Sequence, residues 1–115
     1  NDSFLILSLL YTNIDFNASY SGNLPQQDHI YSQSELRANK IDEKLINSIF
    51  NIQYLDAHLN KSKSDMKIDK WFASISEEDK VKHLIPVGDW NIKNYPTFLT
   101  ERKKLIKSQL ELFLN

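Results

Sequence analysis

The spacing of apolar residues between Pro96 and the C-terminus constrains the fold more than any other feature of the sequence. These residues are Phe98, Leu99, Leu105, Ile106, Leu110 and Phe113. Residues three, four and seven positions apart share one face of an α-helix, whereas a strand would require strict alternation. Pro96 suits the first turn of a helix, where a backbone N–H has no partner in any case. The sequence therefore predicts a long C-terminal helix with one buried face.

The chain has 115 residues, which is enough for one hydrophobic core and too few for two of ordinary size. Apolar residues make up 41% and charged residues 25%, as in ordinary globular proteins, so the composition argues against disorder and fibrous repeats. The absence of cysteine excludes disulfides, thiol nucleophiles and zinc–thiolate sites, and it agrees with the cytoplasmic location that we expect. We therefore expect a single domain over residues 1–115.

The apolar run from Phe4 to Tyr11 is far shorter than the roughly 20 residues of a membrane span, so it predicts a buried helix and no membrane partner. The chain opens at Asn1 rather than at Met, almost inside this helix, and we expect it to be a C-terminal fragment of a longer protein. Turn and cap residues divide the remainder into short elements. We expect strands over residues 24–31 and 49–55, short helices ending near 36 and 47, and helices over 57–64, 68–75 and 76–85. The predicted class is α+β, mostly helical overall.

The net charge of −1 gives no support to a nucleic-acid partner, but the charges are unevenly distributed. All 14 basic residues follow residue 30. Lys61, Lys63, Lys67 and Lys70 cluster around one predicted helical stretch. A solvated helix face explains such a cluster at least as well as a phosphate-binding surface does.

Four polar residues suggest hydrolysis of a phosphodiester. Asp28 and His29 end the first predicted strand, Asn51 lies in the second, and Asn60 follows nine residues later in a helix. An imidazole is a suitable general base because its ordinary pKa lies near neutrality. A hard divalent cation prefers oxygen, which Asp28 and Asn60 both offer, and two protein ligands leave positions open for water and substrate. Neighbouring residues on a strand point to opposite faces, however, so strand geometry alone does not aim Asp28 and His29 at one spot.

The segments Asp28-His29-Ile30 and Asn60-Lys61-Ser62-Lys63-Ser64-Asp65 resemble the HNH endonuclease family, in particular the nuclease module of RNA-guided CRISPR effectors. The resemblance widens with the Leu-rich start, the Asn-Ile-Gln-Tyr-Leu strand, the His-Leu-Ile-Pro turn and the final Phe-x-x-x-Arg-Lys-x-Leu-Ile helix. With these, the chain resembles the C-terminal half of bacterial defence proteins in which a ParB-like nucleotide-using domain precedes an HNH domain. Modification-dependent type IV restriction enzymes belong to this group.

The resemblance implies a ββα-metal (HNH or His-Me finger) core over residues 24–65 and a helical extension over 66–115. It implies that Asp28 and Asn60 hold Mg²⁺ or Mn²⁺, that His29 is the general base, and that Asn51 pins the loop carrying it. Phosphate contacts would come from Lys63 and Lys61, with weaker candidates in Arg37 and Lys40. The expected function is cleavage of DNA in phage defence, leaving a 5′-phosphate and a 3′-hydroxyl, with RNA as an open alternative. The expected partners are DNA and an N-terminal ParB-like domain of the parent chain.

Three features of the sequence depart from the family pattern. Ser32 stands where relatives often have Pro, which leaves the loop after His29 less rigid. The segment between His29 and Asn51 is longer than in compact members, so its helices are placed to cover the site or bind a partner. Asn60 replaces the final His of the family name, as in the CRISPR-like branch, and favours Mg²⁺ or Mn²⁺ over softer ions.

Two other functions compete with nuclease activity. One is a catalytically inactive HNH-like module that binds nucleic acid or docks a partner domain, and the other is a purely helical interaction domain with no metal site. Several single residues also have structural interpretations. His58 and His83 suit solvated, packing or capping roles, and the run Arg102-Lys103-Lys104-Lys107 suits the solvent face of the last helix. We expect the aromatic residues Phe50, Trp71, Phe72, Trp90 and Phe98 to belong to the core rather than to stack on bases.

Overall fold

The computed structural model of the chain describes residues 26–55, 57–64 and 66–114. The predicted helix at the Phe4–Tyr11 run lies outside these residues. Strand β1 (Gln26–His29) pairs antiparallel with β2 (Ile52–Leu55), and the register places Asp28 opposite Gln53. Between them come α2 (Gln33–Ala38), α3 (Glu43–Ile46) and the 3₁₀ turn η1 (Ile49–Asn51).

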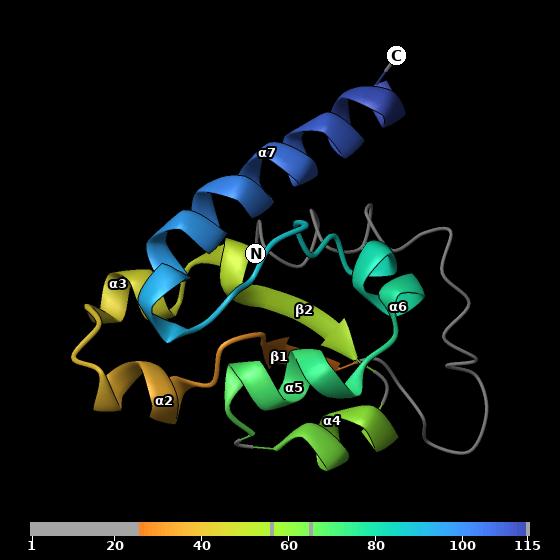
Figure 1. The fold of residues 1–115 in the computed structure, drawn as a ribbon. Helices are drawn as coiled ribbons and strands as arrows, with labels where there is room; N and C mark the ends of the chain where they lie inside the picture. The colour runs from red at the N-terminus through yellow and green to blue at the C-terminus, as the bar shows by residue number, and fades with distance from the viewer. Residues whose placement is uncertain (1–25, 56, 65, 115) are drawn as a thin grey trace.

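After β2 the chain is helical. The elements are α4 (Ala57–Lys63), α5 (Ile68–Ser74), α6 (Glu77–Lys82), the 3₁₀ turn η2 (Ile92–Asn94) and the long α7 (Tyr95–Leu114). The described residues thus form an α+β fold, as predicted. Figure 1 shows three layers, with α7 on one side of the two strands and α4 and α5 on the other. The prediction of a long C-terminal helix opening near Pro96 is confirmed.

Polar caps fix the ends of the short helices. The Ser32 hydroxyl accepts a hydrogen bond from the backbone N–H of Glu35, and the Ser76 hydroxyl accepts one from Asp79, so the predicted caps of α2 and α6 are present. Helix α5 opens at Lys67, whose side chain makes no capping bond. The Glu35 carboxylate accepts from the backbone N–H of Ile68 at 3.0 Å instead. One residue of α2 therefore caps α5 across the core.

An aromatic cluster fills the main core. Tyr31 contacts Tyr95 and Phe98 with ring centroids 4.8 and 5.1 Å apart, and all three residues are fully buried. Phe72 and Trp90 lie against the same ring of Phe98. Trp71 is also buried and Phe50 is partly buried, so the prediction that these aromatic residues belong to the core is confirmed. Edge-to-face pairs of this kind stabilise a core beyond their buried area.

Arg102 joins α7 to the sheet and corrects the prediction that the basic run of this helix faces solvent. Its guanidinium is fully buried and donates hydrogen bonds to the carbonyls of Phe50, Ile52 and His83, at 2.9, 2.6 and 3.0 Å. Arg102 lies four residues after Phe98 and four before Ile106, on the buried face of α7. The neighbouring Lys103, Lys104 and Lys107 are exposed, as predicted.

Candidate functional site

The Asp28 carboxylate sits between the sheet and α4. One of its oxygens, Oδ2, accepts a hydrogen bond from Gln53 Nε2 at 2.9 Å and lies 3.2 Å from the Lys63 ammonium. The first contact follows from the register, which places the two residues opposite each other on one face of the sheet. Both contacts go to the same oxygen, so Oδ1 carries no hydrogen bond from the residues that the structure describes.

Lys63 is buried, which corrects the expectation that it contacts a phosphate. Its side chain is 0% exposed, against 11% for Asp28. The ammonium donates to the His29 carbonyl at 2.7 Å and lies 5.6 Å from the centre of the Trp71 ring. A buried ammonium needs a charged or polar partner, and Asp28 supplies the charge. Lys63 therefore ties α4 to the last two residues of β1 and does not reach solvent.

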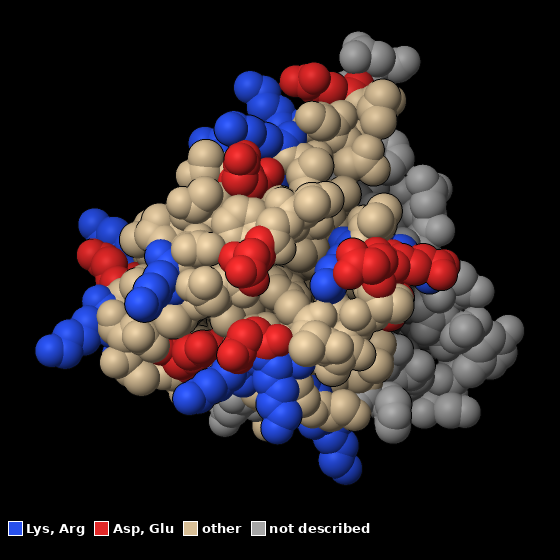
Figure 2. Space-filling view, in the orientation of Figure 1, with Lys and Arg blue, Asp and Glu red and all other residues tan. Residues whose placement is uncertain are grey.

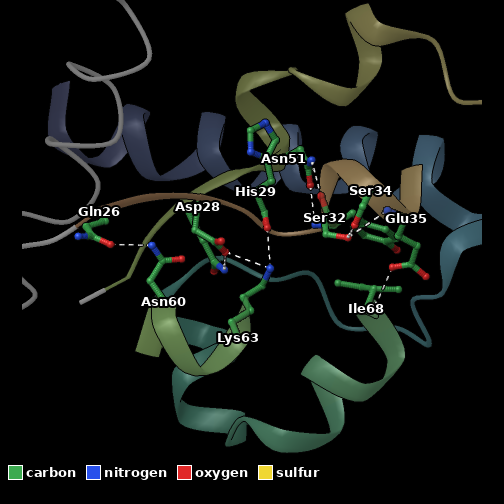
Figure 3. Close-up of polar contacts among 12 residues, drawn as sticks. Gln26, Asp28, His29, Ser32, Ser34, Glu35, Asn51, Asn60, Lys63 and Ile68 are labelled. Atoms are coloured by element: carbon green, nitrogen blue, oxygen red, sulfur yellow. Dashed lines mark hydrogen bonds and ion pairs between the residues drawn. The ribbon is translucent and has the colours of Figure 1, made fainter. Parts of the chain in front are cut away.

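Asn60 lies one helical turn before Lys63 and faces the same strand. Its Nδ2 donates to Gln26 Oε1 at 2.7 Å. Gln26 and Asp28 are two residues apart on β1 and share a face, and the contacts of both go to α4 (Figure 3). The two residues expected to hold a cation, Asp28 and Asn60, thus lie on the same side of β1.

The His29 imidazole lies on the opposite side of the strand from Asp28, Asn60 and Lys63 (Figure 3). Its Nε2 is 3.1 Å from Asn47 Oδ1, beyond the C-terminal end of α3. Strand alternation therefore persists to the last residue of β1, so Asp28 and His29 point to opposite sides of the strand. Both residues nevertheless line one polar hollow of about 150 Å³, together with Gln27, Ser32, Gln33 and Ser64.

Asn51 is fully buried and joins the loop after β1 to the end of α3. Its Oδ1 accepts from the Tyr31 N–H at 2.8 Å, while its Nδ2 donates to the carbonyls of Tyr31 and Ile46, both at 3.1 Å. The Ile30 N–H also donates to the Asn51 carbonyl at 2.7 Å. The side chain thus fixes the loop directly after His29, which is the role that the family resemblance implies for it.

The basic residues expected to contact phosphate are dispersed. Arg37 forms a two-pronged pair with Glu43 at 2.7 and 3.2 Å, which joins α2 to α3 and lowers the pKa of the Glu43 carboxyl. Lys61, Lys67 and Lys70 are exposed on and before helices α4 and α5. Figure 2 shows Lys and Arg along the edge formed by these helices, with acidic side chains interspersed over the rest of the visible face.

The oxygen atoms on the α4 side of β1 are of the type that a hard divalent cation prefers. Asp28 Oδ1 and the Asn60 amide oxygen are hard donors on one side of one strand, without a hydrogen bond from the described residues. Among these residues, no group of three or more His, Cys, Asp or Glu side chains could hold a metal. Any cation here would therefore depend on the carboxylate, the amide and water, a set that suits Mg²⁺ or Mn²⁺ better than Zn²⁺.

Three polar neighbours of the site, Gln26, Asn47 and Gln53, were not predicted from the sequence. Gln53 could have been predicted from the sequence, because it interrupts the apolar run Ile52-Gln53-Tyr54-Leu55. In the structure its side chain is buried. A buried glutamine in such a strand must have a hydrogen-bond partner. Gln26 and Asn47 are exposed and lie in no pattern, so only the fold reveals them.

Comparison with protein-family models, curated proteins and solved structures finds no significant match to this chain. In the part of the chain that the structure describes, no helix is both long and apolar enough to cross a membrane.

Proposed function

We propose that this chain is a metal-dependent endonuclease of the HNH type that hydrolyses DNA phosphodiester bonds. The observation that carries the proposal is the position of Asp28 and Asn60. They come from β1 and α4, far apart in the sequence, and lie on the same side of a strand whose last residue is His29. Two strands followed by a helix across them is also the arrangement that the family resemblance implies.

His29 is the general base in this proposal. Because it is the last residue of β1, a phosphodiester lying across that strand end is flanked by the imidazole on one side and by Asp28 and Asn60 on the other. The imidazole takes a proton from water as the water oxygen bonds to phosphorus and the P–O bond to the 3′ oxygen breaks. The products are a 5′-phosphate and a 3′-hydroxyl.

Asp28 and Asn60 would hold Mg²⁺ or Mn²⁺, which when bound offsets the negative charge that develops on the phosphate oxygens. Lys63 supports this arrangement from inside, because its contact with Oδ2 orients the carboxylate and leaves Oδ1 without a hydrogen bond from the described residues. Asn51 holds the loop after His29. The exposed Lys61 and the Arg37 region are secondary contacts for the nucleic-acid backbone.

The wider biological role follows from the family resemblance alone. We propose that the chain forms the C-terminal nuclease part of a larger bacterial defence protein, in which a ParB-like N-terminal domain selects the target. Residues 24–65 would form the catalytic core and residues 66–115 its helical extension. RNA is the alternative substrate.

A second function, a catalytically inactive module that binds nucleic acid or docks a partner domain, is favoured by one observation. The imidazole faces Asn47 rather than the Asp28 side of the strand. In that position the base would reach only a phosphate that lies across the strand end, and not one bound wholly on the Asp28 side. The two functions differ in whether the wild-type chain cleaves.

Nicking of supercoiled plasmid DNA in Mg²⁺ or Mn²⁺ tests the proposal. We expect the wild-type chain to nick and His29→Ala to lose at least about 100-fold in rate while still binding DNA, because a positioned base contributes a factor of this size. Asn60→Ala should lose both nicking and the increase in thermal stability caused by Mn²⁺. Asn39→Ala is the matched control, because that exposed amide bonds only its own helix. A wild-type chain that nicks with neither metal would establish the inactive module instead.

A further inference from the structure

Asn47 is the residue that contacts the imidazole of His29, and it is placed there by the segment between the two strands. Its Oδ1 lies 3.1 Å from His29 Nε2 and 3.2 Å from Gln33 Nε2. Its Nδ2 points back along α3 to the Glu43 carbonyl at 3.4 Å. All three partners lie within the described residues.

These contacts determine which atom of Asn47 faces the histidine. The Gln33 amide nitrogen donates to the oxygen of the Asn47 amide. The contact of Nδ2 with a carbonyl requires the same orientation. Because Asn47 Oδ1 can only accept, Nε2 of His29 must carry the hydrogen. In the neutral ring the lone pair is then on Nδ1.

The backbone on both sides of this contact is held by one buried side chain. Asn51 bonds the N–H and the carbonyl of Tyr31, two residues after His29, and the carbonyl of Ile46, directly before Asn47. Ile46 is itself fully buried. The imidazole and the amide that meets it are therefore attached to two backbone segments that Asn51 joins, while the contact between the two side chains is itself exposed.

We infer that Asn47 is a positioning residue for His29: it fixes the tautomer with hydrogen on Nε2 and leaves Nδ1 as the basic nitrogen, while Gln33 orients Asn47. The inference rests on the proposed function, since it assigns the atom of His29 that takes the proton. It also gives a role to the long segment between His29 and Asn51, whose helix α3 ends at Asn47. Partners that orient a functional imidazole are commonly worth 10- to 100-fold in activity.

Long-range ¹H–¹⁵N NMR of the free protein, at a pH where imidazole is neutral, reads the tautomer directly and needs neither metal nor DNA. We expect His29 in the wild-type chain to carry its hydrogen on Nε2. Asn47→Ala should give a mixture of tautomers, whereas Asn47→Asp, which keeps an acceptor oxygen in place, should preserve the wild-type pattern. Gln33→Ala should shift the pattern part of the way. Wild-type protein with the hydrogen on Nδ1, or an Asn47→Ala spectrum identical to wild type, would overturn the inference.

Plasmid nicking by the same variants provides the second measurement. Asn47→Ala should lower kcat by about 10- to 100-fold with little change in KM for DNA, because Asn47 acts through His29 and does not bind substrate. Asn47→Asp should recover most of the loss, and thermal unfolding identifies any variant that fails to fold. Equal kcat in Asn47→Ala and wild type would contradict the positioning role of Asn47.

If the wild-type protein has the Nε2 tautomer but does not nick DNA, the proposed function is overturned. The contact between Asn47 and His29 would then have no catalytic meaning. The two failures are therefore distinguishable.

Discussion

Asn51 shows how a single residue can determine the shape of a loop. Its amide satisfies one N–H and two carbonyls that the fold has removed from water, and the side chain is itself inaccessible to solvent. A buried backbone group without a partner costs about as much as a hydrogen bond is worth, or more. The amide is the one side-chain group that can accept from the Tyr31 N–H and donate twice from the same end.

Replacing Asn51 by Ala should therefore destabilise the chain by about 3 kcal/mol, since three backbone groups lose their partner in the interior. The change is measured as a lower midpoint of urea unfolding. Asn39→Ala removes an exposed amide that bonds only to the carbonyl of Glu35, and we expect it to cost less than about 0.5 kcal/mol. Equal midpoints for the two variants would show that the Asn51 contacts contribute little.

Site residues could be predicted from the sequence where a side chain of suitable chemistry lies at a predicted strand end or on a predicted helix. Asp28 and His29 lie on the predicted first strand and Asn60 on the predicted helix, whereas Asn51 lies in the turn η1 directly before β2 rather than in the strand. The environment of Lys63 was not predictable, because exposed and buried lysines look identical in a polar helix. Arg102 was misjudged for the same reason. Its burial depends on which face of α7 meets the carbonyls of η1 and β2, and those carbonyls carry no sequence signal.

At the scale of elements, the attachment of α4 to β1 depends on charge as well as apolar contact. Lys63 and Asp28 pair at 3.2 Å, but their surroundings differ. The ammonium is wholly enclosed, while the carboxylate keeps some exposure and a second donor in Gln53. Removing either partner leaves the other unpaired, and the cost depends on how much water the remaining group can reach.

Asp28→Ala should therefore destabilise the chain more than Lys63→Met, by roughly 3–5 kcal/mol against about 1–2 kcal/mol. The double variant should lose less than the sum of the two, because no buried charge is left over. Urea unfolding of the four proteins measures this coupling. Lys80→Met is the matched control, since its partner Glu77 is largely exposed and such pairs contribute at most about 1 kcal/mol. Additive losses would mean that the two residues act independently.

The helices with a clear apolar periodicity or a capping residue were predicted correctly from the sequence. The limits of the two strands were predicted less accurately. The helix predicted over 57–64 is α4, and the capped helices α2 and α6 begin where Ser32 and Ser76 indicate. The predicted strand over 24–31 is shorter at its end, because Ile30 and Tyr31 leave the sheet for the core. The predicted strand over 49–55 begins with the turn η1 instead, since the Ser48 hydroxyl caps it and Asn51 must reach back to Tyr31.

At the scale of the whole molecule, two buried tyrosines join the segments that frame the site to the C-terminal layer. The Tyr31 hydroxyl donates to the Asn91 carbonyl and the Tyr95 hydroxyl to the Leu45 carbonyl, across 60 and 50 residues of sequence. Their rings also contact each other. Every long-range link of this kind is invisible in the sequence, because it depends on the three layers having already assembled.

The same tyrosines should make the fold sensitive to alkaline pH. Burial raises the pKa of both hydroxyls above the usual 10.0, so the folded chain keeps protons that the unfolded chain releases. Their contribution to stability is therefore complete below pH 10.0 and decreases as the pH rises above it, by at most about 1.4 kcal/mol per pH unit for each group.

Tyr31→Phe should lower the stability near pH 7 by about 1 kcal/mol through its lost hydrogen bond, yet flatten the decline above pH 10. Urea unfolding between about pH 8 and 11.5 measures both effects. Phe98→Leu, which loosens the same cluster without removing a hydroxyl, should lower the whole curve and leave its slope unchanged. If the Tyr31→Phe curve instead ran parallel to that of the wild type, the proton on Tyr31 would have no part in holding the layers together.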